Sequence, residues 1–158
     1  MYKRQVKKLG KINCLVNNAA LFEKDDILNF TDKSWSDHLN VNLLAPAILI
    51  KDFAKQASKK KSSNIINIVD QRVFSLTPIF TSYTLSKSAL YTLTKTMAMR
   101  LAPNIKVNGI APGPTIKSKR QSKSHFNKQA RSTLLKKPVG LKDICDTCLL
   151  YTSPSPRD

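Results

Sequence analysis

Glycine, cysteine and acidic residues are scarce in this chain. Its 158 residues include four glycines, three cysteines and 10 Asp+Glu, against 27 Lys+Arg. Three cysteines give no disulfide framework, and Cys145-Asp-Thr-Cys148 is a single CxxC without a second pair or a nearby histidine, which argues against zinc or redox chemistry. We therefore predict no metal site and a reducing, cytoplasmic environment.

Long apolar runs are also missing. No run is long enough to span a membrane, and no apolar stretch with a small-residue cleavage site follows the basic N-terminus. The sequence therefore predicts neither a membrane partner nor a signal peptide. A length of 158 residues and a hydrophobic content of 41% suit a single domain.

The basic residues give a formal charge of +17. A charge this high is typical of nucleic-acid-binding modules, whose affinity falls steeply with salt. The basic residues cluster at Lys59-Lys60-Lys61 and between 117 and 137, and the second cluster lacks regular aromatics and matches no nucleic-acid motif. We favour a solvated, Lys-rich surface and keep nucleic-acid binding as the alternative.

Apolar periodicity predicts alternating strands and helices. Three short apolar runs, typical of buried parallel strands, lie at 12–16, 65–69 and 105–110. Helical spacing of apolar residues fills the gaps, from 34 to about 57 and from 83 to 101. Thr31 or Asp32 suits the cap of the first helix, Pro46 predicts a kink in it, and Pro103 forbids continuation of the second. This order predicts an α/β domain with a parallel sheet and right-handed crossovers.

Tyr83-Thr-Leu-Ser-Lys87 is the most informative stretch. A tyrosine and a lysine four residues apart share one helix face. An ammonium close to a phenol lowers the phenol pKa, so the pair can act as an acid or base near neutral pH. The alternative is an amphipathic helix with one solvated lysine.

Ligands of parallel sheets bind beyond the carboxyl ends of the strands. The segments 17–20, 70–72 and 111–115 follow the three predicted strands. We expect the last two to converge with Tyr83 in space.

These pieces resemble the short-chain dehydrogenase/reductase family. The matches, in the family's order and spacing, are Leu15-Val-Asn-Asn-Ala-Ala20 for its NNAG turn, Asn40-Val-Asn-Leu43 for its asparagine segment, Tyr83 to Lys87 for YxxSK, and Val107-Asn-Gly-Ile-Ala-Pro-Gly113 for the segment ending in PG. The resemblance implies a Rossmann-type, doubly wound parallel sheet, of which three strands and their helices are retained. It also implies transfer of a hydride between a nicotinamide cofactor and a substrate carbon.

The resemblance assigns roles to particular residues. Tyr83 would be the acid/base, Lys87 would lower its pKa and hold the nicotinamide ribose, and Asn42 would hold a water that relays protons. Asn17 would steady the central sheet. The implied cofactor contacts are Asn17, Ala19, Tyr83, Lys87, Pro112, Gly113 and Thr115. Alternatives stay open for the roles of two residues. The Asn42 side chain could instead hydrogen-bond backbone within its own helix, and Thr115 could be a plain loop residue.

The family's glycine-rich cofactor loop has no match here. Only sixteen residues precede Asn17, and none of the four glycines forms GxxxGxG. Without that loop no helix N-terminus holds the pyrophosphate, so we expect the chain as given to bind cofactor poorly and to be inactive. The resemblance favours NADP(H) over NAD(H).

Asp70 stands where the family normally has a serine, thirteen positions before Tyr83. A carboxylate suits a substrate that presents N–H donors or needs a proton relay. Pteridine and dihydromonapterin reductases of this family resemble the chain here, and Phe22 matches the aromatic that stacks on their flat pterin. The alternatives are an altered, inactive site for Asp70 and core packing for Phe22; Arg72 either pairs with Asp70 or faces solvent.

We therefore predict a reductase of a small pterin or dihydrofolate-like substrate, with Asp70, Phe22 and Tyr83 contacting that substrate. The alternative is a generic carbonyl or 3-oxoacyl thioester reductase. The resemblance also implies that the full-length parent forms a homo-oligomer, a tetramer.

Both ends of the chain resemble translated adapter sequence from transposon-based sequencing libraries. Residues 1–5 and 148–152 are consistent with the two strands of one inverted repeat, and a native Ser/Pro-rich disordered tail is the alternative for 148–158. We expect residues 6–147 to be an internal fragment, the C-terminal two-thirds of a family domain. A nucleotide sequence without the repeat at either end would contradict this.

Overall fold

A computed structural model describes residues 6–8, 10–57 and 62–152. Its centre is a parallel sheet in the order β1-β2-β3, formed by Cys14–Asn17, Ser63–Ile68 and Ile105–Ile110. Cys14 pairs with Asn64, and Ser63 pairs with Ile105. The predicted α/β architecture and parallel order are confirmed, and the strand ends differ from the prediction by at most two residues.

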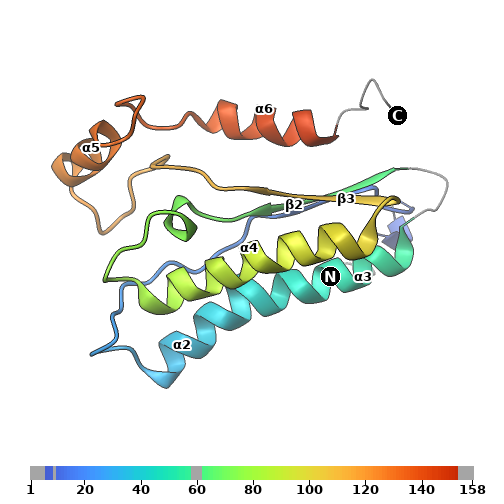
Figure 1. The fold of residues 1–158 in the computed structure, drawn as a ribbon, viewed down its shortest axis with the longest axis horizontal. Helices are drawn as coiled ribbons and strands as arrows, with labels where there is room; N and C mark the ends of the chain where they lie inside the picture. Colours follow the sequence, from blue (N-terminus) through green and yellow to red (C-terminus); the bar gives the residue numbers. More distant parts are fainter. Residues whose placement is uncertain (1–5, 9, 58–61, 153–158) are drawn as a thin grey trace.

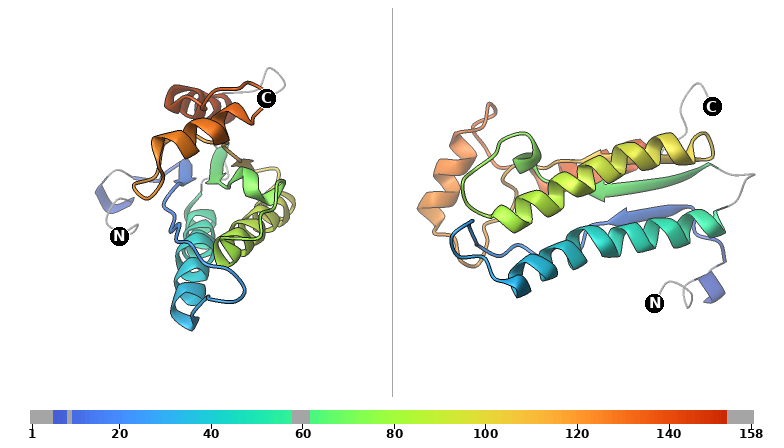
Figure 2. Two further views of the ribbon diagram at one scale, coloured as in Figure 1. Left: turned by 90° about the vertical axis from the view of Figure 1, so that its left-hand side faces the viewer. Right: turned by 60° about the horizontal axis from the view of Figure 1, so that its bottom comes forward.

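Helices cover both faces of the sheet (Figures 1 and 2). One face carries α2 (Asp32–Leu39), the π-helical turn η1 (Asn40–Leu44), α3 (Ala45–Gln56) and α4 (Thr81–Leu101). The other face carries α6 (Leu141–Thr152), and α5 (Lys123–Arg131) lies beyond one end of the strands. The short 3₁₀ helix η2 (Gln71–Val73) follows β2. The carboxyl ends of the strands, η2, the start of α4 and α5 thus gather at one end of the molecule.

The chain from α2 to α3 shows how local sequence sets local structure. Thr31 caps α2 in a capping box with Ser34, as expected of one of the two candidate caps. The predicted single helix is interrupted by η1, and Pro46 lies in the first turn of α3. Proline has no N–H for the carbonyl of Asn42 to accept, so the helix accommodates Pro46 by a wider π turn.

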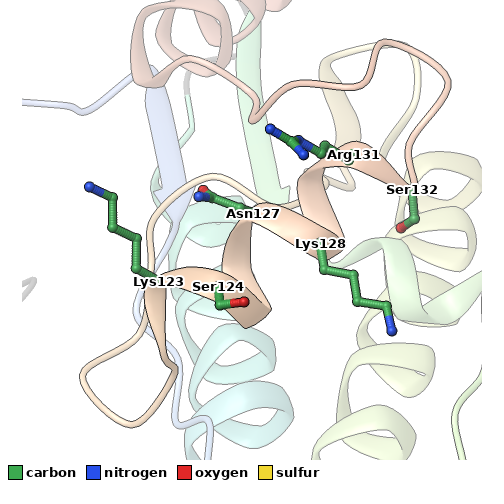
Figure 3. Close-up of a pocket in the computed structure, with 6 residues that line it drawn as sticks. All are labelled: Lys123, Ser124, Asn127, Lys128, Arg131 and Ser132. Atoms are coloured by element: carbon green, nitrogen blue, oxygen red, sulfur yellow. The ribbon is translucent and has the colours of Figure 1, made fainter.

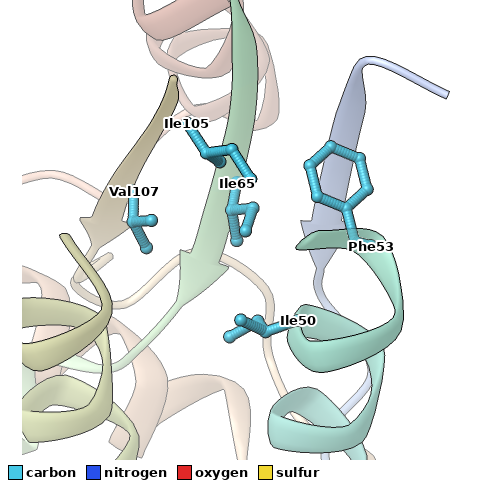
Figure 4. Packing of buried hydrophobic residues seen from close by; sticks show 5 residues of the cluster. All are labelled: Ile50, Phe53, Ile65, Ile105 and Val107. Atoms are coloured by element: carbon cyan, nitrogen blue, oxygen red, sulfur yellow. The ribbon is translucent and has the colours of Figure 1, made fainter. Parts of the chain in front are cut away.

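The apolar core lies between β2, β3 and α3. It consists of Ile50, Phe53, Ile65, Ile105 and Val107 (Figure 4). Burial of these side chains supplies most of the stabilisation that holds α3 against the sheet. Within the described ranges, no helix is both long and apolar enough to cross a membrane.

Two predictions concern segments at the margins. Lys59-Lys60-Lys61 and residues 1–5 lie outside the described residues. Cys148 to Thr152, which we assigned to a non-native end, continue α6; the origin of both ends stays a prediction.

Candidate active site

Tyr83 and Asp70 meet at the end of the sheet. Tyr83 lies in the first turn of α4 and is only 5% exposed. Its hydroxyl donates a hydrogen bond to Asp70 Oδ2 at 2.6 Å. Asp70 lies two residues after β2, and its Oδ1 accepts the backbone N–H of Arg72 at 2.8 Å, which fixes the carboxylate. The expected convergence of the segment after β2 with Tyr83 is confirmed.

The Tyr83 hydroxyl is held in its protonated form. Burial raises the pKa of Tyr83 well above its ordinary range, and the charge of Asp70 and the hydrogen bond to it raise the pKa further, while Arg72 acts weakly in the opposite direction. Our prediction that Lys87 would lower this pKa is wrong for this structure. The carboxylate contacts the phenol directly and disfavours a second negative charge.

Lys87 is buried on the same helix. It is 2% exposed, and its Nζ donates to the carbonyl of Ile68 at 2.8 Å. Nζ lies 6.0 Å from the centre of the Tyr83 ring. Burial lowers the pKa of Lys87 to about 8, although the charge of Asp70 opposes this shift. The lysine is therefore partly neutral at mildly alkaline pH, which weakens its effect on Tyr83.

Asn42 binds the turn after β1. Its Oδ1 accepts the N–H of Leu21 at 2.8 Å, and its Nδ2 donates to the Leu21 carbonyl at 2.9 Å and to Ser86 Oγ at 3.0 Å. These contacts differ from the alternative of bonding within its own helix. The side-chain amide holds the turn against α4, and its predicted part in a proton relay stays a prediction.

Asn17 ties the sheet to α4. Its Nδ2 donates to Asn67 Oδ1 at 2.8 Å, and Asn67 Nδ2 donates to Thr94 Oγ1 at 2.9 Å. All three residues are buried. These two hydrogen bonds link β1, β2 and α4, as expected if Asn17 steadies the sheet.

Phe22 lies against Tyr83. The two ring centres are 4.6 Å apart in an edge-to-face arrangement, and Phe22 also stacks on Phe80 at 4.5 Å. The Arg72 guanidinium lies 4.7 Å from the Phe80 ring centre and 5.5 Å from that of Phe22. Arg72 thus packs on the rings, an arrangement that neither alternative for it anticipated. Phe22 is 40% exposed, so core packing does not fully account for it.

The loop after β3 is fastened beside Asp70. The Pro112 carbonyl accepts the N–H of Gln71, and the Pro114 carbonyl accepts that of Val139. Thr115 Oγ1 donates to the Gly113 carbonyl at 2.9 Å, which is a contact within the loop. A Cβ on Gly113 would come within 3.3 Å of Gln71 Oε1, so a small residue suits this close approach. Ala19 lies two residues after β1 and is exposed.

Four buried or part-buried residues near Tyr83 were absent from the predicted site: Asp25, His38, Phe80 and Ser82. Asp25 and Ser82 are hydrogen-bonded to one another, and the His38 ring centre lies 6.1 Å from that of Tyr83. His38 precedes Asn42 by one helical turn, which was the available sequence signal. Asp25 offered none, since its partner is 57 positions away.

The basic segment forms an open surface on α5 (Figure 3). A shallow hollow there is lined by Lys123, Ser124, Asn127, Lys128, Arg131 and Ser132. Five of them lie in α5 and Ser132 is its C-cap, and no described hydrogen bond, ion pair or ring contact of these residues reaches Tyr83, Asp70 or Phe22. Among the described residues, no group of three His, Cys, Asp or Glu side chains could hold a metal ion.

Comparison with known proteins gives the family. Residues 1–128 match the family model of short chain dehydrogenase. Human dehydrogenase/reductase SDR family member 4 is 39% identical over 110 residues, which are 68% of this chain and 40% of that protein. The 2-dehydro-3-deoxy-D-gluconate 5-dehydrogenase of Dickeya dadantii is 36% identical over 115 residues, 72% of this chain and 46% of that protein.

A solved structure, FolM alternative dihydrofolate reductase 1 from Brucella suis in complex with NADP, superposes with a TM-score of 0.91 at 41% identity, over 95% of this chain and 61% of that one. The chain thus spans about two-fifths to three-fifths of the length of these proteins. The family model covers more than half of the chain, and its motifs lie where the structure places the site. The chain belongs to the short chain dehydrogenase family.

Proposed function

We propose that the site serves an NADP(H)-dependent reductase of a pterin or dihydrofolate-like substrate, with Tyr83 as the proton donor. The observation that carries this proposal is the 2.6 Å hydrogen bond from Tyr83 to Asp70 beside the Phe22 ring. The likeness to a dihydrofolate reductase at 41% identity supports it. A serine would serve a carbonyl substrate better than this carboxylate does.

Asp70 selects for substrates that donate hydrogen bonds. An ionised carboxylate has only acceptors. A pterin ring presents an amino group and ring N–H groups along one edge, whereas a simple ketone presents only an acceptor. Phe22 offers an exposed aromatic side chain, which favours a flat ring.

The same contact explains when Tyr83 releases its proton. Reduction of a C=N bond adds a hydride to carbon and a proton to nitrogen. N–H groups of a bound substrate would compete for Asp70, and the carboxylate would then no longer hold the Tyr83 proton or raise its pKa as strongly. The phenol would become a stronger acid when the substrate is in place.

The residues present fit the nicotinamide end of a cofactor. A bound nicotinamide supplies or accepts the hydride. Lys87 has three N–H donors, of which the described residues engage one, at the Ile68 carbonyl, so two are available for ribose hydroxyl groups. Asn17, Ala19 and the loop from Pro112 to Thr115 lie at the same end of the sheet and would flank the nicotinamide. The preference for NADP rests on the similarity to NADP-bound FolM.

The test uses a fusion protein in which residues 6–147 follow the upstream, N-terminal residues of Brucella suis FolM. These upstream residues supply the cofactor-binding part, and we call the fusion the FolM-fronted enzyme. We expect NADPH-dependent reduction of 7,8-dihydrofolate or a dihydropterin. Tyr83→Phe should lower kcat by about 10² to 10⁴, and Asp70→Ser should lower kcat/KM for the pterin by about 10²-fold, since each removes a proton-handling group. Thr84→Val is the control, since the buried Thr84 hydroxyl has no partner among the described residues.

A second candidate is reduction of a small carbonyl compound, because curated relatives at 34–38% identity include dehydrogenases and reductases of keto-gluconates. Turnover of 5-keto-gluconate or a 3-oxoacyl thioester, without turnover of dihydropterin, would favour this candidate. Asp70→Ser with unchanged pterin reduction would also count against the pterin proposal.

A further inference from the structure

We propose that Asp25, His38 and Ser82 form a buried positioning network that sets the placement of Phe22 and Tyr83, and through them the fit of a flat substrate. The three side chains are 3%, 0% and 1% exposed. They act through the two aromatic residues and do not themselves contact the reacting atoms. The proposal rests on the substrate role given to Phe22 above.

The backbone on both sides of Phe22 is held by one helix face. His38 Nε2 accepts the N–H of Glu23 at 3.1 Å, and Asn42 Oδ1 accepts that of Leu21 at 2.8 Å. His38 and Asn42 are four residues apart, so both project from the same side. Phe22 lies between the two anchored amides and cannot move far without breaking one of them.

Asp25 holds the start of α4. Its carbonyl accepts the N–H of Phe80 at 2.6 Å, its Oδ1 accepts that of Ser82 at 3.2 Å, and its Oδ2 accepts the Ser82 hydroxyl. Phe80 stands at the N-cap position but provides no side-chain cap. Asp25 therefore performs the capping from a distant loop, and its negative charge is favourable at the positive end of the helix.

The same contacts constrain Phe80. Its φ of 64° places a bulky residue in the left-handed region, a strained conformation that persists only where its surroundings impose it. The hydrogen bond to the Asp25 carbonyl imposes it here. In this conformation Phe80 stacks on Phe22, and Tyr83 follows three residues later.

His38 joins the two halves of the network. Its Nδ1 lies 2.7 Å from Ser82 Oγ and 2.8 Å from the Ser34 carbonyl. Because Nε2 accepts the Glu23 N–H, the ring proton must reside on Nδ1, where it is shared between these two acceptors. The Ser82 hydroxyl then donates to Asp25. In this series of hydrogen bonds, the Glu23 amide, the His38 ring N–H and the Ser82 hydroxyl each have an acceptor. This pairing defines one orientation for each side chain.

Two measurements on the unmodified 158-residue chain test the network directly. Long-range ¹H–¹⁵N NMR correlations should show His38 as the neutral Nδ1–H tautomer at pH 7, and the Glu23 amide should be protected from hydrogen exchange although it lies in a loop. A proton on Nε2, or a Glu23 amide that exchanges at the rate of an open loop, would overturn the proposal. Neither measurement depends on cofactor or substrate.

The matched variants are Ser82→Ala and Thr84→Val, which each remove one buried hydroxyl from the first turn of α4. Ser82→Ala should weaken the NMR cross-relaxation between the Phe22 and Tyr83 rings. It should also reduce the affinity for 7,8-dihydropterin about tenfold, because a tenfold change corresponds to the loss of one hydrogen bond. Thr84→Val should leave both unchanged, since its hydroxyl has no described partner. In the FolM-fronted enzyme, Ser82→Ala should raise KM about tenfold and change kcat by less than about twofold.

The outcomes separate the two proposals. Equal behaviour of Ser82→Ala and Thr84→Val in ring contacts overturns the network, whatever the substrate is. If the unmodified chain shows the Nδ1–H tautomer and the ring contact but the FolM-fronted enzyme neither binds nor reduces dihydropterin, the network stands and the pterin proposal fails. If Ser82→Ala does not fold, the tautomer and exchange measurements still decide the question.

Discussion

The helices from α2 to α4 differ from α5 and α6 in what they bury. The α2–η1–α3 segment and α4 bury the polar and charged side chains His38, Asn42, Ser86, Lys87 and Thr94, most of them with defined partners. Over residues 123–152, all of which are described, α5 buries only Ala130 and α6 buries no side chain fully. Leu134 between them is 99% exposed.

This difference matches the position of the site. A buried polar group is costly unless it is paired, so each paired one fixes a geometry. The site residues Tyr83, Lys87 and Asn42 all project from the face with the buried partners. The segment 116–142, which includes α5 and leads into α6, contributes exposed cations: it contains nine Lys or Arg and no acidic residue. We expect precise placement in α2 to α4 and tolerance to change in α5, α6 and the segment before them.

The largest expected contrast is between two isoleucines. Ile65 in β2 is fully buried, and Ile116 after β3 is 68% exposed. Ile65→Ala should lower the free energy of unfolding by about 3 to 4 kcal/mol because it leaves a cavity, whereas Ile116→Ala should change it by less than about 0.5 kcal/mol. Urea unfolding measures both, and similar losses for the two variants would break the comparison.

Asparagine gives the next contrast. Asn42→Ala removes three hydrogen bonds and leaves unpaired partners at the half-buried Leu21 and the buried Ser86, so it should cost about 3 kcal/mol. Asn127→Ala on α5 removes an exposed amide and should cost almost nothing. Denaturant midpoints at constant slope check this, and an Asn42→Ala cost below that of Asn127→Ala would contradict it.

Lys87 should affect stability in a pH-dependent way. Its pKa is about 8 in the folded chain, below its ordinary value of 10.5, so the unfolded state binds more protons between these pH values and stability should rise with pH there. Above pH 10 the raised pKa of Tyr83 acts in the opposite direction, because unfolding then releases the phenolic proton.

Lys87→Met should therefore stabilise the fold by about 1 to 2 kcal/mol at pH 7, a net value that includes the loss of the hydrogen bond to the Ile68 carbonyl. It should also remove the rise of stability with pH above pH 8. Lys128→Met on α5 is the matched control and should do neither. Thermal unfolding at pH 7, 8, 9 and 10 measures this. A rise between pH 8 and 10 that survives in Lys87→Met would assign it to another group.

The smallest effect concerns the basic surface. Lys123 lies at the start of α5, where a cation opposes the helix dipole. Lys123→Glu should stabilise the chain by about 0.5 kcal/mol at low salt, and Lys123→Gln by about half as much. Both gains should vanish in 0.5 M NaCl. A gain that persists at high salt would mean that α5 is held by contacts other than exposed charge.

Sequence patterns were sufficient for the parallel α/β arrangement and for the meeting of Asp70 and Tyr83. Apolar periodicity predicted the three strands and the two helical regions between them, and the order of elements predicted the parallel sheet, whereas α5 and α6 were not predicted. The position of Asp70 after the second predicted strand, and of Tyr83 at the start of the helix that follows, predicted that they would meet. Pro46 signalled an irregularity, although its form was a π turn.

The hydrogen-bond partners of the buried side chains were harder to predict. Lys87 was expected to act on Tyr83, yet its ammonium is directed to the Ile68 carbonyl and the phenol to Asp70. His38, Ser82 and Asp25 carry no motif that reveals their contact, because they are brought together from α2, α4 and the loop after β1.

The sequence by itself determined what is local: the three strands and the helical regions between them, the α/β order, and the family to which Tyr83, Lys87, Asn42 and the PG turn point. Only the tertiary structure decided which side chain pairs with which, and hence that the pKa of Tyr83 is raised and that of Lys87 lowered. The physical reason is that periodicity depends on neighbours within a few residues, whereas burial and hydrogen bonding depend on groups as far as 57 positions apart, such as Asp25 and Ser82.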